Sequence, residues 1–262
     1  MFQIIAYIKF LFRSTNQHGV HSPFVYNLLT KCIYKKYRKR DYNLLFDFRD
    51  FMLSDNRTIS VIDFGAGSRV FKSPLRRVSQ IAKNAGISKK RAVLLNKITS
   101  YFNFQTALEL GTSVGISSVA IAANNPVQLI SLEGCPETAR TAKEGFKQFD
   151  LSNIRLKVGE FESNIDAIIK EKSLSQNNTF DLIYFDGNHQ KEPTLHYFNK
   201  LLPLAHNDSV FIFDDIHWSK EMEEAWEEIK LNPKVKVSID AFFWGLIFFR
   251  KEQEKEHFAL RL

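Results

Sequence analysis

Thr106-Ala-Leu-Glu-Leu-Gly-Thr-Ser-Val-Gly-Ile-Ser117 decides the fold of this chain. An apolar run ends at Gly111, Gly115 follows four residues later, and a helical pattern opens at Ile116. A strand that turns through glycines into a helix lets the backbone approach a ligand closely, and the positive end of the helix then faces that ligand. The stretch therefore predicts the kind of β-α turn that binds nucleotide-like ligands in an α/β sheet.

Glycine turns also occur for purely structural reasons, and the following strand favours the binding interpretation here. Residues 127–132 are apolar and lead into Glu133. This acid comes about 20 positions after Gly111, the spacing at which nucleotide-binding sheets place a carboxylate on the ribose hydroxyls.

The rest of the C-terminal part alternates apolar strands with amphipathic helices. Such alternation predicts right-handed β-α-β units and a parallel sheet that is buried on both faces. Strands are expected at 106–110, 127–132, 153–158, 180–185 and 209–213, with helices at 136–149, 161–172, 191–203 and 219–231. Two final β-rich runs, 234–241 and 243–250, suggest a hairpin.

Glu109-Leu-Gly-Thr-Ser-Val-Gly115, followed by Glu133, resembles the motif of class I S-adenosylmethionine (SAM)-dependent methyltransferases. Ser113 occupies the place of the middle glycine in the nicotinamide fingerprint, which disfavours a dehydrogenase. The resemblance covers about residues 104–250. It implies a Rossmann-like, doubly wound, mostly parallel seven-stranded α/β sheet that ends in an antiparallel hairpin, with SAM as the cofactor.

The resemblance also implies which residues hold SAM. The backbone of the turn would run beside the methionine part of the donor, Glu109 would lie under its amino group, and Glu133 would bind the ribose. Glu160, after the next strand, would lie near the adenine. The full expected set is Glu109, Gly111, Thr112, Ser113, Gly115, Glu133, Gly159 and Glu160.

Acidic side chains follow two later strands. Asp186 ends the fourth predicted strand, and Asp214 and Asp215 end the fifth. Carboxylates that converge at one sheet edge repel each other unless they share a proton or a cation, and hard oxygen ligands suit Mg²⁺. The pattern is similar to that of metal-dependent catechol-type O-methyltransferases. The resemblance thus implies a divalent-metal site at Asp186, Asp214 and Asp215.

Two departures from the catechol-type pattern leave the metal open. The second pair is Asp-Asp instead of Asp-Asn, and His189 replaces a lysine base three residues after Asp186. Imidazole can act as a general base near neutral pH. We therefore expect Asp186 and His189 to serve in proton removal or metal binding.

The predicted function is SAM-dependent methylation, with oxygen of a small molecule as the favoured acceptor. Two alternatives remain: an RNA or other nucleic-acid methyltransferase that uses the basic N-terminal region, and a non-catalytic SAM-binding protein. The acceptor and the oligomeric state are not specified by the sequence.

Charge separates the chain into two parts. Residues 1–105 hold 19 of the 36 Lys and Arg but 5 of the 29 Asp and Glu. We therefore expect a basic, mainly helical extension at 1–103 and a methyltransferase domain at 104–262. The extension contains a glycine loop, Asp63–Ser68, that either forms only a tight turn or, with Arg69 and Lys72, covers the active site and binds an anionic group.

Compartment and membrane contact follow from composition. Cys32 and Cys135 have no metal-like spacing and suit a reducing, cytoplasmic setting. No run reaches the roughly 20 apolar residues of a spanning helix. The apolar residues 1–13 are expected to pack on the protein rather than lie on a membrane surface.

Overall fold

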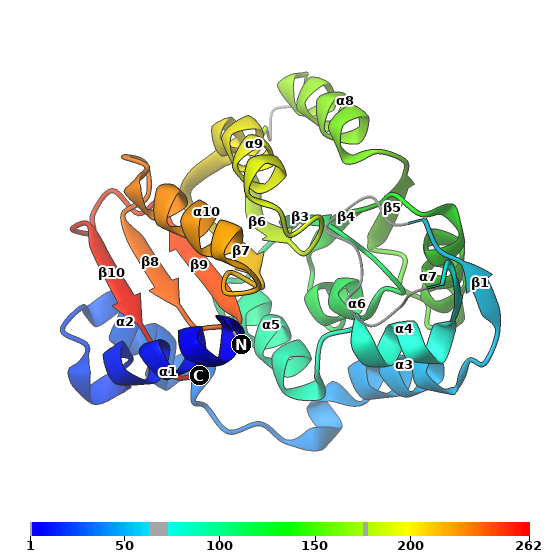
Figure 1. The fold of residues 1–262 in the computed structure, drawn as a ribbon, viewed down its shortest axis with the longest axis horizontal. Coiled ribbons are helices and arrows are strands. Elements are labelled where there is room, and N and C mark those ends of the chain that lie inside the picture. The colour runs from blue at the N-terminus through cyan, green and yellow to red at the C-terminus, as the bar shows by residue number, and fades with distance from the viewer. Residues whose placement is uncertain (1, 63–72, 175–177) are drawn as a thin grey trace. The chain divides into compact units, whose positions relative to one another are not determined.

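The computed structural model of the chain describes residues 2–62, 73–174 and 178–262. The predicted glycine loop 63–68, with Arg69 and Lys72, lies outside these residues. Contacts divide the chain into two compact units: unit 1 contains Met1–Lys35 and Ile169–Leu262, and unit 2 contains Lys36–Ile168. Figure 1 shows the elements of both.

Unit 2 contains the strands of the glycine motif. Strand β3 (Thr106–Leu110) pairs in parallel with β4 (Gln128–Glu133), and β4 pairs in parallel with β5 (Ile154–Val158). The register places Glu109 opposite Ser131 and Glu133 opposite Val158. The last residues of β3 are buried, as expected for a strand that is covered on both faces.

Helices cover these strands with apolar side chains. Phe48 stacks on Phe146 at 5.9 Å between ring centroids, which joins α3 to α7. The last helix, α8, begins in unit 2 and ends in unit 1. The helices are the 3₁₀ turn η3 (Lys39–Tyr42), α3 (Asn43–Ser54), α4 (Val78–Asn84), α5 (Lys89–Phe102), α6 (Ile116–Ala122), α7 (Pro136–Gln148) and α8 (Phe161–Ser173).

The segment before the predicted glycine loop differs from the pattern of a sheet strand. Strand β1 (Thr58–Ser60) pairs antiparallel with β2 (Leu75–Arg77) in a separate two-stranded ribbon. The helix α4, which follows β2, begins at Val78. The apolar run before Asp63 was too short to distinguish a ribbon from a sheet strand.

Unit 1 holds the remaining strands. Strand β6 (Phe180–Phe185) is parallel to β7 (Ala205–Asp214), which is antiparallel to β9 (Trp244–Phe248). Strand β8 (Val237–Asp240) pairs antiparallel with β9, so the predicted terminal hairpin is confirmed. A further strand, β10 (Glu256–Ala259), pairs in parallel with β8 and had no signal in the sequence.

The helices of unit 1 come from both ends of the chain. Ser22 caps the helix that begins at Pro23; regular α-helix ends at Asn27, and a π-helical stretch continues it. On α10, Trp226 lies against β9, where a Cβ on Gly245 would come within 2.5 Å of its ring. The elements are α1 (Phe2–Arg13), η1 (Gln17–Gly19), α2 (Pro23–Asn27), η2 (Leu28–Ile33), α9 (Lys191–Leu201), η4 (Leu202–Leu204) and α10 (Lys220–Leu231).

Among the described residues, no helix has the length and apolar character needed to cross a bilayer.

Candidate functional site

The glycine turn of unit 2 joins β3 to α6. The backbone N–H groups of Gly111 and Thr112 both donate to the carbonyl of Leu132, at 2.9 and 3.1 Å. Three residues of the turn have left-handed backbone: Gly111 at φ 104°, Ser113 at φ 50° and Gly115 at φ 87°. Since L side chains rarely adopt this conformation, the turn needs its glycines and holds Ser113 under strain.

Gly115 has a packing role in addition to its backbone role. A Cβ at this position would lie 2.6 Å from the Phe146 ring of α7. The N-terminus of α6 therefore approaches α7 more closely than any side chain would permit.

Alanine at Gly115 is expected to destabilise the protein by about 2–4 kcal/mol, from left-handed strain and overpacking together. Gly159→Ala is the matched control: its φ is 126°, but its Cβ would meet only the Asn164 amide at 3.4 Å. We expect this control to cost about 1–2 kcal/mol from strain alone. Urea unfolding compares the two variants, and equal losses would contradict the packing role of Gly115.

Glu109 is a fully buried carboxylate next to the turn. Its Oε2 accepts hydrogen bonds from the hydroxyls of Ser118, on α6, and Ser131, on β4. Its Oε1 is buried without a hydrogen-bond partner among the described residues. Burial raises the pKa of Glu109 to about 6, although the nearby serine hydroxyls oppose this shift. A buried, unpartnered carboxylate oxygen suits a cationic ligand group.

Glu133 fixes the turn from the end of β4. Its Oε2 accepts the backbone N–H of Ser113 at 2.6 Å, and its Oε1 accepts that of Cys135 at 2.8 Å. Burial raises the pKa of Glu133, and the backbone N–H donors oppose the shift. Each carboxylate oxygen has two lone pairs, so both retain capacity for another donor such as a ribose hydroxyl.

The end of β5 is joined to the backbone of Glu133. The N–H of Gly159 donates to the carbonyl of Glu133 at 2.9 Å. Glu160 is exposed, and its carbonyl accepts the amide N–H groups of Asn164 at the start of α8. Unit 2 thus brings together the predicted set from Glu109 to Gly159, with the Glu160 side chain at the surface.

The second predicted set lies in unit 1, after β6. The His189 Nε2 atom is 3.8 Å from Asp186 Oδ1. Asn188 and His189 both have left-handed backbone, with φ of 74° and 43°. The Asn188 Oδ1 atom is buried and has no hydrogen-bond partner among the described residues. The loop therefore holds an acid, an imidazole and an open amide acceptor in a strained arrangement.

Asp214 is the last residue of β7, and Asp215 follows it. Asp214 is buried, and its Oδ2 accepts the Tyr184 hydroxyl at 3.1 Å while its Oδ1 accepts the N–H of Asp215. Asp215 has φ 55°, and its N–H also donates to the carbonyl of Phe243. The two neighbouring acids are thus held by different partners.

The described residues contain no ready-made ligand group at the predicted metal site. Among residues 2–62, 73–174 and 178–262, no three His, Cys, Asp or Glu side chains form a group that could hold an ion. Asp214 directs its oxygens to Tyr184 and to the backbone, and Asp186 lies beside His189. A Mg²⁺ site at Asp186, Asp214 and Asp215 therefore stays a prediction.

A buried histidine joins the β7 turn to the terminal hairpin. His217 lies between Glu223 at 2.7 Å and Asp240 at 3.0 Å, and its ring stacks on Phe242. Burial opposes protonation of His217, but the two carboxylates outweigh it and raise the pKa of the imidazole. Phe242 has φ 69°, an unusual backbone for a bulky residue.

Left-handed residues show where the strain is concentrated. Apart from glycines, the described residues that have positive φ fall into two groups. One group lies at or just past helix C-termini, where this conformation is common: Asn103, Asn124 and Asp150. The other follows the carboxyl ends of sheet strands: Ser113, Asn188, His189, Asp215 and Phe242. Such strain typically accompanies function.

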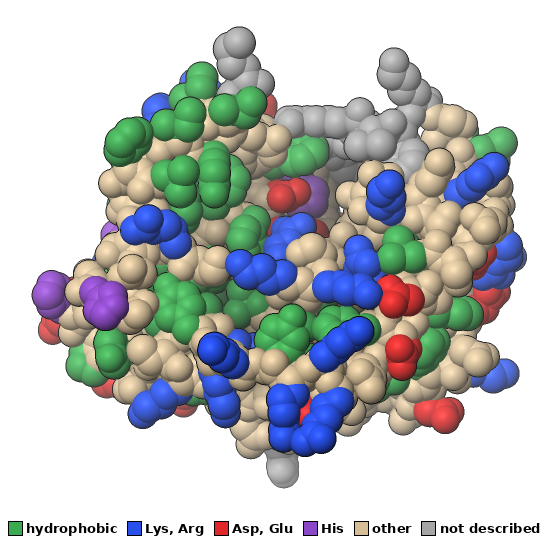
Figure 2. All heavy atoms as spheres, turned by 90° about the horizontal axis from the view of Figure 1, so that it is seen from below, with side chains coloured by type: hydrophobic (Ala, Val, Ile, Leu, Met, Phe, Trp, Pro, Cys, Tyr) green, Lys and Arg blue, Asp and Glu red, His purple; other side chains and the backbone are tan. Residues whose placement is uncertain are grey.

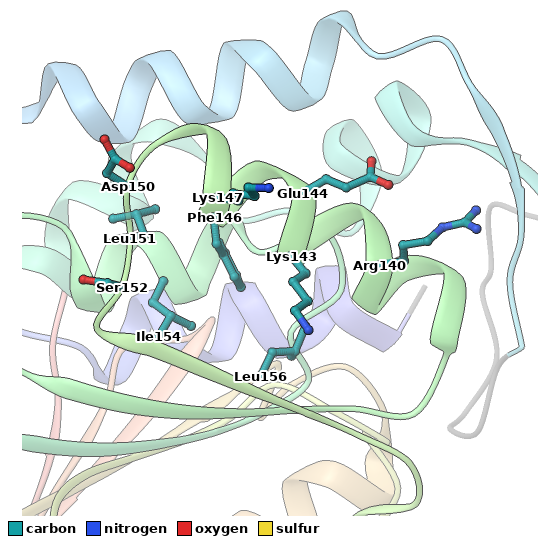
Figure 3. A pocket seen from close by; sticks show the side chains of 10 residues that line it. All are labelled: Arg140, Lys143, Glu144, Phe146, Lys147, Asp150, Leu151, Ser152, Ile154 and Leu156. Atoms are coloured by element: carbon teal, nitrogen blue, oxygen red, sulfur yellow. The ribbon is translucent and has the colours of Figure 1, made fainter.

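A separate cavity of about 650 Å³ lies between α7 and β5 (Figure 3). Its walls combine basic side chains of α7 with apolar side chains near β5, including Lys143, Lys147, Leu151 and Leu156. None of its lining residues belongs to either predicted set. The cavity therefore contributes nothing to the candidate site.

Sequence reasoning missed several site residues. Ser118 and Ser131 hold Glu109, and Tyr184 holds Asp214, but a single serine or tyrosine within an apolar element carries no signal. Asn188 had a weak signal, because Gly-Asn after a strand is typical of a left-handed turn.

Comparison with known proteins finds a matching family model for one segment of the chain. A family model described as a methyltransferase domain matches residues 108–216. No curated protein matches the chain.

Solved structures share the fold at low identity. The SAH-bound methyltransferase PaMTH1 from Podospora anserina is 15% identical, with a TM-score of 0.58 over 79% of this chain and 88% of that one. Cofactor-bound Rv0187 from MTB is 14% identical, with a TM-score of 0.55 over 87% and 95%. The SAM complex of the O-methyltransferase TomG from Streptomyces achromogenes, involved in tomaymycin synthesis, is 16% identical, with a TM-score of 0.54 over 63% and 82%.

The predicted fold class is thereby confirmed, with β10 as an additional strand. The matched segment contains the glycine turn, Glu133 and the acids after β6 and β7. Residues 108–216 thus match a methyltransferase-domain family model, and the chain shares its fold with solved methyltransferases.

Proposed function

We propose that the chain transfers a methyl group from SAM to an oxygen atom of a small molecule. The observation that carries this proposal is the glycine turn held by Glu133 beside the buried, unpartnered Oε1 of Glu109. The O-methyltransferase TomG, which shares the fold, is bound to SAM. The methyltransferase domain would extend over 104–262, with 1–103 as its basic extension.

In the proposed complex, the residues of unit 2 hold SAM. Glu133 accepts the ribose hydroxyls with the lone pairs that the backbone leaves free. Glu109 Oε1 faces the ammonium of the methionine part, for which a buried anion is a complementary partner. Gly111, Thr112, Ser113 and Gly115 allow the backbone to pass close to the donor, and Gly159 and Glu160 border the adenine.

For the loop after β6 in unit 1, the proposed role is proton removal. His189 takes the proton of the acceptor hydroxyl, which makes the oxygen a better nucleophile. Asp186, 3.8 Å from the imidazole, stabilises the imidazolium that forms. Asn188 Oδ1 is available to orient the acceptor through one hydrogen bond.

Metal assistance is a separate hypothesis, because the described side chains contain no group of three metal ligands. Assays with EDTA, followed by Mg²⁺ addition, test it. Turnover that is unchanged by EDTA excludes the metal, and loss with recovery on addition supports it.

A screen of acceptors tests the proposed function. The purified chain is incubated with methyl-labelled SAM and phenolic, carboxylate, RNA or DNA acceptors, and label transfer is measured. Transfer to a phenolic or other hydroxyl compound supports the proposal. Label on nucleic acid favours the polymer alternative, and SAM binding without transfer to any acceptor favours the non-catalytic one.

The cytoplasmic setting of the protein stays a prediction.

SAM affinity is expected to fall as the pH drops below about 6, because the pKa of Glu109 is about 6 in the free protein. An ammonium next to Oε1 favours the ionised carboxylate, so binding releases a proton in this range and affinity falls by up to about tenfold per pH unit. Calorimetry at pH 5, 6 and 7.5 measures the slope.

Glu109→Gln is the control for this slope. This variant should bind SAM more weakly at pH 7.5 and lose the part of the pH dependence that belongs to Glu109. Identical slopes in the two proteins would refute the contact between Glu109 and the ammonium.

A further inference from the structure

Helix α1 exposes an apolar face. Ile4, Ile8 and Phe12, each four residues apart, lie on one side of the helix and are 67%, 49% and 89% exposed. Ile5 and Leu11 border them and are also exposed. The outward face of a surface helix is ordinarily polar, so this face requires an explanation.

The opposite face of α1 holds the helix on unit 1. Ala6 and Phe10 are buried, and the Phe10 ring packs on Phe242 at 5.6 Å. Arg13, at the end of the helix, forms an ion pair with the buried carboxylate of Asp240. The helix is therefore anchored through one face, and the side chains of its apolar outward face stay exposed.

The N-terminal segment of unit 1 that contains α1 is basic. Residues 1–35 carry four Lys and Arg and no Asp or Glu. Lys9 is exposed on α1 itself, and Arg13 is about half exposed. Figure 2 shows hydrophobic side chains gathered over α1 with Lys and Arg side chains beside them.

We propose that this face of α1 docks on an anionic lipid bilayer. The apolar side chains would enter the boundary between headgroups and acyl chains, while Lys9 reaches the phosphates along its apolar stem. With 12 residues the helix is shorter than the roughly 20 residues that span a bilayer, so it lies in the surface plane.

A lipid surface fits this face better than a second copy of the chain. A symmetric dimer places the same patch of both copies together, and each copy would bring its own acid-free segment. Like charges brought together in this way oppose association, whereas anionic headgroups attract them. The sequence predicts that residues 1–13 pack on the protein. This holds for the face of α1 with Ala6 and Phe10, whereas the opposite face is exposed.

Vesicle flotation with the full chain tests the proposal. The vesicles are phosphatidylcholine alone, or phosphatidylcholine with about a third phosphatidylglycerol. We expect binding to the anionic vesicles, weakened by salt, and at least about tenfold weaker binding by the double variant Ile8→Glu/Phe12→Glu. The control is Leu231→Glu, which charges an equally exposed apolar residue at the end of α10 and should bind normally.

Three results would overturn the proposal. The wild type fails to float with anionic vesicles, the double variant floats as well as the wild type, or light scattering shows a dimer that the double variant loses while neither protein binds vesicles. Calorimetric SAM binding should be equal in the wild type and the double variant, so the docking surface is tested independently of the proposed activity.

Discussion

Replacing Glu133 with alanine is expected to weaken SAM binding by at least about 100-fold. The variant would lose the charge-assisted hydrogen bonds between the ribose and the Glu133 carboxylate, worth about 3 kcal/mol together. The N–H groups of Ser113 and Cys135 would also lose their acceptor, so the glycine turn would lose the contact that holds it at the end of β4. Isothermal titration calorimetry with SAM measures the effect.

Glu137→Ala is the matched control for this substitution. Glu137 lies four residues later, in the first turn of α7, where its carboxylate pairs with Arg140 and faces no predicted ligand. Its loss should leave SAM affinity unchanged. If Glu133→Ala remains folded and binds SAM within about threefold of the wild type, the assignment of the ribose site to this carboxylate is wrong.

Replacing His189 with alanine is expected to lower kcat by about 100- to 10,000-fold, the range of general-base contributions. The affinity for SAM should stay unchanged, because the donor is held by residues of unit 2. Release of S-adenosylhomocysteine, followed with the best acceptor of the screen, measures kcat. A loss in kcat without a change in the SAM dissociation constant separates proton removal from cofactor binding.

His196→Ala controls for the general effect of removing an imidazole from unit 1. His196 is exposed on α9, outside the loop after β6. This variant should turn over normally. Equal kcat values for His189→Ala and the wild type would refute His189 as the base and shift attention to Asp186, tested as Asp186→Asn.

The local patterns predicted the elements well where they were long and periodic. The strands around Glu109 and Glu133 and the helix α7 lie within one or two residues of their predicted bounds. The strand β10 was missed because four residues that are largely exposed carry no alternation of apolar and polar side chains. The ribbon of β1 and β2 was missed because a strand of three residues is too short to show periodicity, and its pairing depends on a segment elsewhere in the chain.

Some residues of the candidate site could be predicted from the sequence, and others could not. A strand that ends in an acid or a glycine is visible in the sequence, so Gly111, Glu133 and Asp186 could be named from it. Their partners depend on contacts between residues far apart in the chain. The hydroxyls on Glu109 Oε2 come from two different elements, and the metal expectation for the acids after β6 and β7 depended on side-chain directions that spacing does not specify.

The sequence by itself determined the α/β class, the glycine turn and the strand ends that carry acids, because backbone geometry and hydrophobic periodicity are local properties. Only the tertiary structure decided that Glu109 is buried with one open oxygen, that Asp214 is directed to Tyr184, and that α1 exposes its apolar face. Burial and hydrogen-bond pairing depend on which distant segments pack together, and the same local pattern is compatible with several such packings.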